Sequence, residues 1–192
     1  MSVAPGPGEP ARGAAALAPA SPVLTFAGPD DAEACAAVIA EMDAHYRALD
    51  GATHALPPVE TYAAEIRGWI EAREGAHFLL ARAGAGTGAR AGARDGALDG
   101  AGAPMGVACV SVLRPGHVLQ GLVFLKDLYV MRAHRRAGVG EALLRGVLDW
   151  ARAEGLGRVD LTVSPENPAA RALYARFGGQ ELTDRLFTRF DL

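Results

Sequence analysis

One continuous segment, residues 122–163, constrains the fold more than any other. It reads LVFLKDLYV, then MRAHRRA, then GVGEALLRGVLDWARAEG, and it ends close to RVDLTV. The middle part repeats apolar residues at the spacing of one helix face, through Leu143, Val147 and Trp150, and Gly155 follows as a stop signal. A strand, a turn, a helix and a second strand in this order predict an α/β or α+β fold.

The rest of the chain supplies the remaining elements of such a domain. We expect strands at 23–27, 77–83, 105–113 and 187–192, and helices at 29–49, 59–73 and 167–178. The order is therefore one strand, two helices, a hairpin, and then β-α-β-α-β. It predicts a mixed sheet flanked by helices within a single domain, residues 23–192.

Two stretches lack the large apolar side chains that a core needs. Residues 1–22 are rich in proline, glycine and alanine, so we expect a disordered N-terminal tail. Residues 84–103 contain seven glycines and only one large apolar residue, Leu98. They predict a flexible insertion that lengthens a hairpin turn.

Composition and charge exclude several classes of function. The 192 residues carry a formal net charge of −3, which argues against nucleic acid or an anionic membrane surface as the main partner. The two cysteines, Cys35 and Cys109, lie in small or apolar runs without metal-ligand spacing, so we expect free buried thiols and no metal site. With neither a membrane-span run nor a signal-peptide pattern, the sequence predicts a cytoplasmic protein.

Two glycines stand where the helix after residue 130 should begin. The first amides of a helix lack partners within the helix, and the helix dipole is positive at that end. Gly138 and Gly140 would let an anion approach the main chain, and Arg132, Arg135 and Arg136 add positive charge nearby. On these residues alone, a plain strand-to-helix turn rich in arginine is an equal alternative.

The common phosphate-binding loops do not fit this turn. A dinucleotide fingerprint needs a third glycine at the position of Leu143, and a P-loop needs lysine followed by serine or threonine. What remains, Arg135-x-x-Gly138-x-Gly140, resembles the pyrophosphate-binding loop of the GNAT superfamily of acetyl-CoA-dependent N-acetyltransferases.

Two flanking segments carry the same resemblance. Upstream, LKDLYV is similar to the central strand of that family. Downstream, NPAARALYARFGG is similar to its second signature, through Asn167, Ala170, Tyr174 and Gly178. The resemblance covers about residues 23–192 and implies a mixed, mostly antiparallel central sheet.

The resemblance also implies how acetyl-CoA would be bound. In the family a bulge splays the central strand, and the pantetheine arm pairs with its exposed backbone, here at Leu128 and Val130. Main-chain amides of the glycine turn would cradle the pyrophosphate. The cofactor-binding candidates are Leu128, Tyr129, Val130, Arg135, Arg136, Ala137, Gly138, Val139, Gly140, Glu141 and Asn167.

Tyr174 matches the tyrosine that protonates the departing thiolate of coenzyme A in that family. The alternative is a core residue, since Ala170, Leu173, Tyr174 and Phe177 form an apolar stripe at helical spacing. Asn167 precedes a proline, so an N-cap role is compatible with a cofactor contact.

Lys126 departs from the family pattern. The stretch FLKDLYVM is closest to diamine (spermidine/spermine-type) acetyltransferases, in which a glutamate at this strand position helps to take the proton from the amine. A charged lysine cannot take that proton. The acceptor still has to lose it, because an alkylammonium is only about one part in a thousand deprotonated at pH 7. Lys126 either reaches solvent or lines the acceptor site, where it would favour an acceptor carrying a carboxylate.

The base that replaces the glutamate is not identified by the sequence. Simple alternation along the strand places Asp127 on the other face from Lys126. Asp43, Glu60 and His45 are more distant candidates. His45 and Tyr46, at the end of the first helix, are also candidate acceptor contacts.

These observations predict an N-acetyltransferase that moves the acetyl group of acetyl-CoA to the primary amine of a small molecule, such as an amino acid or a diamine. Direct attack in a ternary complex is expected, and a homodimer is common in this fold. The missing glutamate favours a different class, a non-catalytic acyl-CoA-binding module. A phosphate- or nucleotide-binding domain unrelated to acetyl transfer is the third alternative.

Overall fold

The computed structural model describes residues 22–51, 53, 55–72, 75–84, 102–114 and 120–184. Its elements, in chain order, are β1 (Val23–Phe26), η1 (Pro29–Asp31), α1 (Ala32–Asp50), α2 (Val59–Ala72), β2 (Ala76–Arg82), β3 (Pro104–Leu113), β4 (Leu122–Val130), η2 (Arg132–His134), α3 (Val139–Ala153), β5 (Val159–Leu161) and α4 (Pro168–Arg176).

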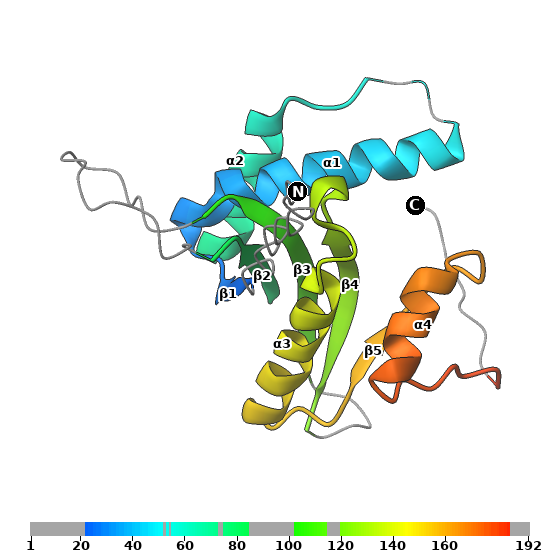
Figure 1. Ribbon diagram of the computed structural model, residues 1–192. Coiled ribbons are helices and arrows are strands. Elements are labelled where there is room, and N and C mark those ends of the chain that lie inside the picture. The colour runs from blue at the N-terminus through cyan, green and yellow to red at the C-terminus, as the bar shows by residue number, and fades with distance from the viewer. Residues whose placement is uncertain are drawn as a thin grey trace, which may run out of the picture.

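The five described strands form one sheet in the order β1-β2-β3-β4-β5 (Figure 1). The first four are antiparallel neighbours, and β4 pairs with β5 in parallel. The predicted fold class, a mixed and mostly antiparallel sheet flanked by helices, is confirmed. The parallel strands β4 and β5 flank α3 in the chain, as predicted for residues 122–163.

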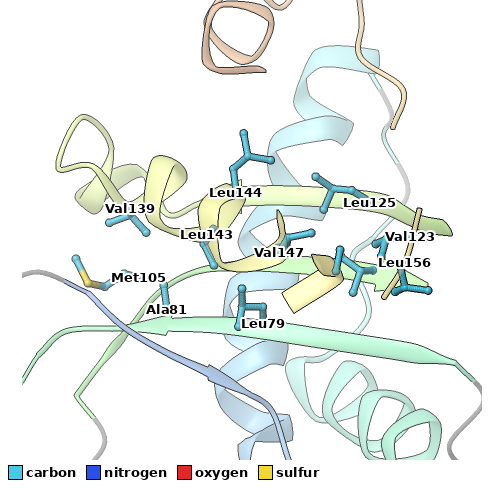
Figure 2. Close-up of a cluster of buried hydrophobic side chains, with 13 residues drawn as sticks. Leu79, Ala81, Met105, Val123, Leu125, Val139, Leu143, Leu144, Val147 and Leu156 are labelled. Atoms are coloured by element: carbon cyan, nitrogen blue, oxygen red, sulfur yellow. The ribbon is translucent and has the colours of Figure 1, made fainter. Parts of the chain in front are cut away.

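The helices cover the two faces of the sheet and give it two separate cores. On one face, α3 buries Val139, Leu143 and Val147 against side chains of β2, β3 and β4 (Figure 2). Each fully buried aliphatic side chain of this kind contributes about 1.5–3 kcal/mol. On the other face, α1 and α2 pack on a second cluster that includes Cys35, Cys109 and Tyr129 of α1, β3 and β4; we call this side the α1 face. Both cysteines are buried and free, as predicted.

Most predicted element boundaries agree with the structure within a few residues. The predicted strand at 158–163 is shorter, Val159–Leu161, and its pairing with β4 covers only Val123 to Leu125. The predicted strand at 187–192, residues 1–21 of the expected tail and residues 85–101 of the expected insertion lie outside the described residues.

Candidate cofactor and acceptor site

The site begins where β4 loses its second neighbour. Pairing between β4 and β5 ends at Leu125 and Leu161, while β4 runs on to Val130 beside β3 alone (Figure 1). The β3–β4 register shifts at the same place, because Val110 lies opposite Leu125 and Cys109 lies opposite Asp127. Lys126 is therefore the extra residue of a β-bulge. The segment from Lys126 to Val130 has a free edge on the β5 side within the described chain.

This bulge corrects the sequence-based placement of Asp127. Val123 and Leu125 pack under α3, and so do Leu128 and Val130. Before the inserted residue the odd-numbered positions of β4 face α3, and after it the even-numbered positions do. Asp127 stands directly opposite Cys109, whose side chain is buried on the α1 face. Simple alternation was wrong here: Asp127 shares the α1 face with Lys126.

The turn before α3 has the backbone geometry of an anion-binding loop. Arg136 has φ 64° and Gly138 has φ 79°, both in the left-handed region. Such residues turn successive amides toward one side and form a concavity that accepts anions. The main-chain amides from Arg136 to Glu141 donate no hydrogen bond to any other described residue. These amides are therefore available to a ligand.

The two glycines have different roles in this loop. A Cβ on Gly138 would meet nothing within 4 Å, so this glycine is required for its positive φ. A Cβ on Gly140 would lie 3.6 Å from Leu173 of α4 and 3.6 Å from Val130 of β4. Gly140 therefore faces the region between the free edge of β4 and α4.

The outer side of the loop carries charged side chains of α3 and α4. Arg176 of α4 donates to Glu141 in the first turn of α3 at 2.5 Å. Arg145 lies 5.6 Å from the ring centroid of Phe177. A surface groove of about 400 Å³ runs along α3 from Gly138 and Glu141 to Arg145. The cationic groups and the groove adjoin the free amides.

Arg135 points away from this groove and toward β4. Its guanidinium donates to the Tyr129 hydroxyl at 3.2 Å and to the Val130 carbonyl at 3.2 Å, and it lies over the Tyr129 ring. Glu41 of α1 accepts hydrogen bonds from the Tyr129 hydroxyl at 3.2 Å and from the Arg132 amide at 2.8 Å. The glycine loop, the end of β4 and α1 are thus joined by one hydrogen-bonded network.

Tyr174 lies near the bulge. It is half-buried on the apolar stripe of α4 that packs on the α3 core. Burial raises the pKa of Tyr174, and the neighbouring Tyr46 and Asp127 raise it further. The phenol is therefore protonated at neutral pH and lies close enough to both groups to interact with them. A core position and a position at the site are compatible.

The predicted acceptor residues gather on the α1 face. His45 Nδ1 is 3.4 Å from an Arg132 guanidinium nitrogen, and the His45 ring lies 6.0 Å from the Tyr129 ring. Tyr46 is 44% exposed, and burial together with Asp127 raises its pKa. Lys126 is exposed beside Asp127. The structure therefore brings His45, Tyr46 and Lys126 to one side of the bulge.

Two of the more distant base candidates lie elsewhere. Asp43 accepts hydrogen bonds from Arg47 at 3.0 Å and from the Tyr62 hydroxyl, between α1 and α2. Glu60 is exposed in the first turn of α2. Neither is part of the group formed by Asp127, Tyr46 and Tyr174.

The cysteines do not supply a nucleophile in their present surroundings. Burial raises the pKa of Cys35 to about 12 and holds the pKa of Cys109 well above its usual range. The reactive thiolate is therefore scarce at neutral pH. The described residues contain no group of three or more His, Cys, Asp or Glu side chains arranged to hold a metal ion.

Asn167 caps α4. Its side chain accepts a hydrogen bond from the Ala170 amide at 3.1 Å, and Pro168 occupies the first helical position. This confirms the predicted N-cap. Among the described helices, none combines the length with the apolar content that crossing a bilayer requires.

Comparison with known proteins agrees with this geometry. The model of the acetyltransferase (GNAT) family matches residues 57–179, which include β4, the glycine loop, α3 and α4. The chain belongs to the GNAT acetyltransferase family. The family of the sequence-based resemblance is confirmed, whereas its likeness to the diamine enzymes stays a prediction.

Curated relatives match this GNAT chain over short segments. N-acetyltransferase family 8 member 3 of Rattus norvegicus is 31% identical over 87 residues, 45% of this chain and 38% of the relative. Thialysine N-epsilon-acetyltransferase of Mus musculus is 36% identical over 62 residues, 32% of this chain and 36% of the relative. The chain thus spans little more than a third of the length of either relative.

Solved structures match nearly the whole GNAT domain and support its fold. Ribosomal-protein-alanine N-acetyltransferase from Brucella melitensis biovar Abortus 2308 aligns with a TM-score of 0.62 at 18% identity, over 88% of this chain and 100% of that one. AAC(6')-Iy in complex with the bisubstrate analogue CoA-S-monomethyl-acetylneamine aligns with a TM-score of 0.61 at 17% identity, over 89% and 99%.

Sequence reasoning missed two features of this GNAT site. The network of Glu41 has no local signature, because Glu41 and Arg132 are 91 positions apart. The placement of Asp127 depends on the bulge. The apolar residues gave a signal for it: Val123 and Leu125 are odd-numbered, whereas Leu128 and Val130 on the same face are even-numbered.

Proposed function

We propose that this protein transfers the acetyl group of acetyl-CoA to the primary amine of a small molecule. The observation that carries the proposal is the juxtaposition of three features of the described chain: an edge of β4 and a loop of amides at the start of α3, both without partners among the described residues, and a protonated tyrosine on α4. The membership in the acetyltransferase family supports the same activity.

The residues around β4 fit acetyl-CoA as a substrate. The amides from Arg136 to Glu141 would bind the diphosphate, because they lack partners in the described chain and the helix dipole is positive there. The free edge of β4 at Leu128 and Val130 would pair with the amides of the pantetheine arm. The groove along α3 near Arg145 leaves room for the adenosine end.

The chemistry proceeds by direct attack in a ternary complex. The neutral amine nitrogen attacks the thioester carbon, the carbonyl π bond opens, and a tetrahedral intermediate forms. When it collapses, the C–S bond breaks and the sulfur takes the proton of the Tyr174 hydroxyl. The amide nitrogen returns its second proton to the Tyr174 oxygen. The low acidity of both thiols makes an acyl-cysteine an unsuitable alternative.

Acetyl-CoA turnover with a panel of amines tests this function. Thiol release measured with amino acids, diamines, aminoglycosides and peptide N-termini should give a rate well above hydrolysis for at least one small amine. The second candidate, a non-catalytic acyl-CoA-binding module, is favoured by Lys126 at the strand position of the family glutamate. Binding of acetyl-CoA without turnover of any amine would support that module and contradict an enzyme.

The charge at Lys126 favours an acceptor that carries a carboxylate. Its ammonium is exposed on the same face as Asp127, so a second cationic centre on the acceptor would meet a like charge. We expect wild type to acetylate amino acids in preference to spermidine, and Lys126→Glu to shift the ratio of kcat/KM toward spermidine by about tenfold, which corresponds to about 1.4 kcal/mol. Faster turnover of spermidine than of any amino acid by wild type would contradict this acceptor class.

A further inference from the structure

We propose that Asp127 is the catalytic base. The bulge at Lys126 places the carboxylate of Asp127 on the α1 face, the same face as Lys126, which stands at the family's glutamate position. This inference rests on the proposed function. Acetyl transfer needs a neutral amine, and the group that removes its proton must lie within hydrogen-bond reach of the amine, directly or through one water. Lys126, which stands at the family's glutamate position, cannot accept a proton while it is charged.

The register of β4 places Asp127 on the α1 face. Without a bulge, residues 126 and 127 would face opposite sides of the sheet. With Lys126 as the inserted residue, Asp127 pairs with Cys109, and the side chains of an opposed pair lie on the same face. Two positions later Tyr129 is buried on that face against α1. Asp127 thus lies on β4, the strand beside which both acetyl-CoA and the acceptor are expected to bind.

The surroundings of Asp127 favour proton transfer from an ammonium to its carboxylate. The carboxyl is half-buried at the point where the free edge of β4 begins. The titratable groups that face it are Lys126 on its own strand, Cys109 on β3, Tyr46 on α1 and Tyr174 on α4. Cys109, Tyr46 and Tyr174 are neutral at pH 7, because their ordinary pKa values lie above 7 and burial raises them further. Among the residues that the structure describes, Lys126 is therefore the cation that would compete with an incoming ammonium for Asp127.

The proton transfer is balanced and uses both neighbours. The acceptor enters as R–NH3+ and gives one proton to a carboxylate oxygen of Asp127, leaving the lone pair on nitrogen for attack. Burial raises the pKa of Asp127, which makes its carboxylate a better proton acceptor than an exposed one. The Lys126 ammonium lowers the pKa of the nearby acceptor amine by like-charge repulsion. After the reaction, Asp127 releases its proton to solvent through the exposed side of the site.

Asp127→Asn is the direct test, with Asp30→Asn as the matched control at an exposed position of η1, away from the groove along α3. We expect Asp127→Asn to lower kcat for the best amine by about 100-fold or more. The affinity for coenzyme A should stay within about twofold, since the amide loop is untouched. The acidic limb of the pH–rate profile should disappear from the residual activity. Asp30→Asn should match wild type in all three measurements.

Stability against pH gives a readout that does not depend on turnover. A buried carboxyl with a raised pKa is penalised when charged. Its contribution to stability therefore falls as the pH rises from its unfolded pKa through its folded pKa. Asp127→Asn should melt at a higher temperature than wild type at pH 7, and the difference should vanish at acidic pH. An unchanged or lower melting temperature at pH 7 would contradict the burial of this charge.

Moving the carboxylate separates a proton acceptor from a merely structural group. The double variant Lys126→Glu/Asp127→Asn places a carboxylate at the neighbouring position on the same face. It should recover at least a tenth of the wild-type kcat, whereas Asp127→Asn alone should not. Wild-type kcat in Asp127→Asn would overturn the proposal and leave the acetyltransferase activity standing. A wild type that turns over no amine would overturn both.

Discussion

Replacing Gly140 by valine should weaken the binding of coenzyme A by about 100-fold. The Cβ of residue 140 points between Leu173 of α4 and Val130 of β4, where the proposed diphosphate reaches the first amides of α3. A branched side chain there would displace the phosphates from the main chain. Losing two charge-assisted hydrogen bonds at about 1.5 kcal/mol each gives about this factor. Calorimetric titration with coenzyme A measures it.

Gly68 provides the matched control for Gly140. It lies within α2, a Cβ there meets nothing within 4 Å, and it is remote from the loop. Gly68→Val should therefore bind coenzyme A like wild type. Equal affinity of Gly140→Val and Gly68→Val would contradict the placement of the diphosphate at this helix start.

A second pair separates strain from binding. Gly138 and Gly155 flank the two ends of α3 with φ 79° and φ 67°, and a Cβ on either would meet nothing within 4 Å. Alanine at either position should cost about 1–2 kcal/mol of stability, because the left-handed region is strained for residues with a Cβ. Only Gly138→Ala should also weaken coenzyme A binding. If both variants leave the affinity unchanged, the loop is not the binding site.

Tyr174→Phe should lower kcat by about 100-fold or more while leaving KM for acetyl-CoA within about threefold. The raised pKa of Tyr174 keeps its proton available at neutral pH, and the sulfur of coenzyme A needs that proton as the C–S bond breaks. Steady-state kinetics with the best amine measures both constants. The wild-type rate should also fall at alkaline pH, above the range of an ordinary tyrosine, as the phenol loses its proton.

Tyr62→Phe is the control for the loss of a tyrosine hydroxyl. Tyr62 donates to Asp43 between α1 and α2, so its removal should affect stability and leave kcat unchanged. A Tyr174→Phe variant with wild-type kcat would assign Tyr174 to the core stripe alone. A stable Tyr174→Phe variant with low kcat excludes that assignment.

The sequence predicted what depends on local pattern. Helix and strand periodicity gave β4 with its observed bounds, Leu122–Val130, and gave α1 to α4 within a few residues. The glycine turn was also predicted, because an arginine-rich segment before two glycines is local in sequence. The capping role of Asn167 followed from the proline that comes next.

The features that the sequence did not predict depend mostly on contacts between segments that are far apart in the chain. Alternation along β4 holds only without a bulge, and the register shift opposite Cys109 and Val110 is a property of the β3–β4 pair. The left-handed φ of Arg136 is unusual for a residue with a side chain, so sequence preference argues against it. Glu41 joins α1 to β4 by tertiary contact alone. Each of these features bears on the site.

The central claim is that main-chain amides at the start of α3 bind the diphosphate of coenzyme A. Isothermal titration of wild type with coenzyme A, and in parallel with pantetheine, which lacks the diphosphate, tests it most directly. We predict saturable binding of coenzyme A and at least about 100-fold weaker binding of pantetheine, the factor that two lost phosphate hydrogen bonds would give. Equal affinity for the two molecules, or no binding of coenzyme A at millimolar concentration, would contradict the claim.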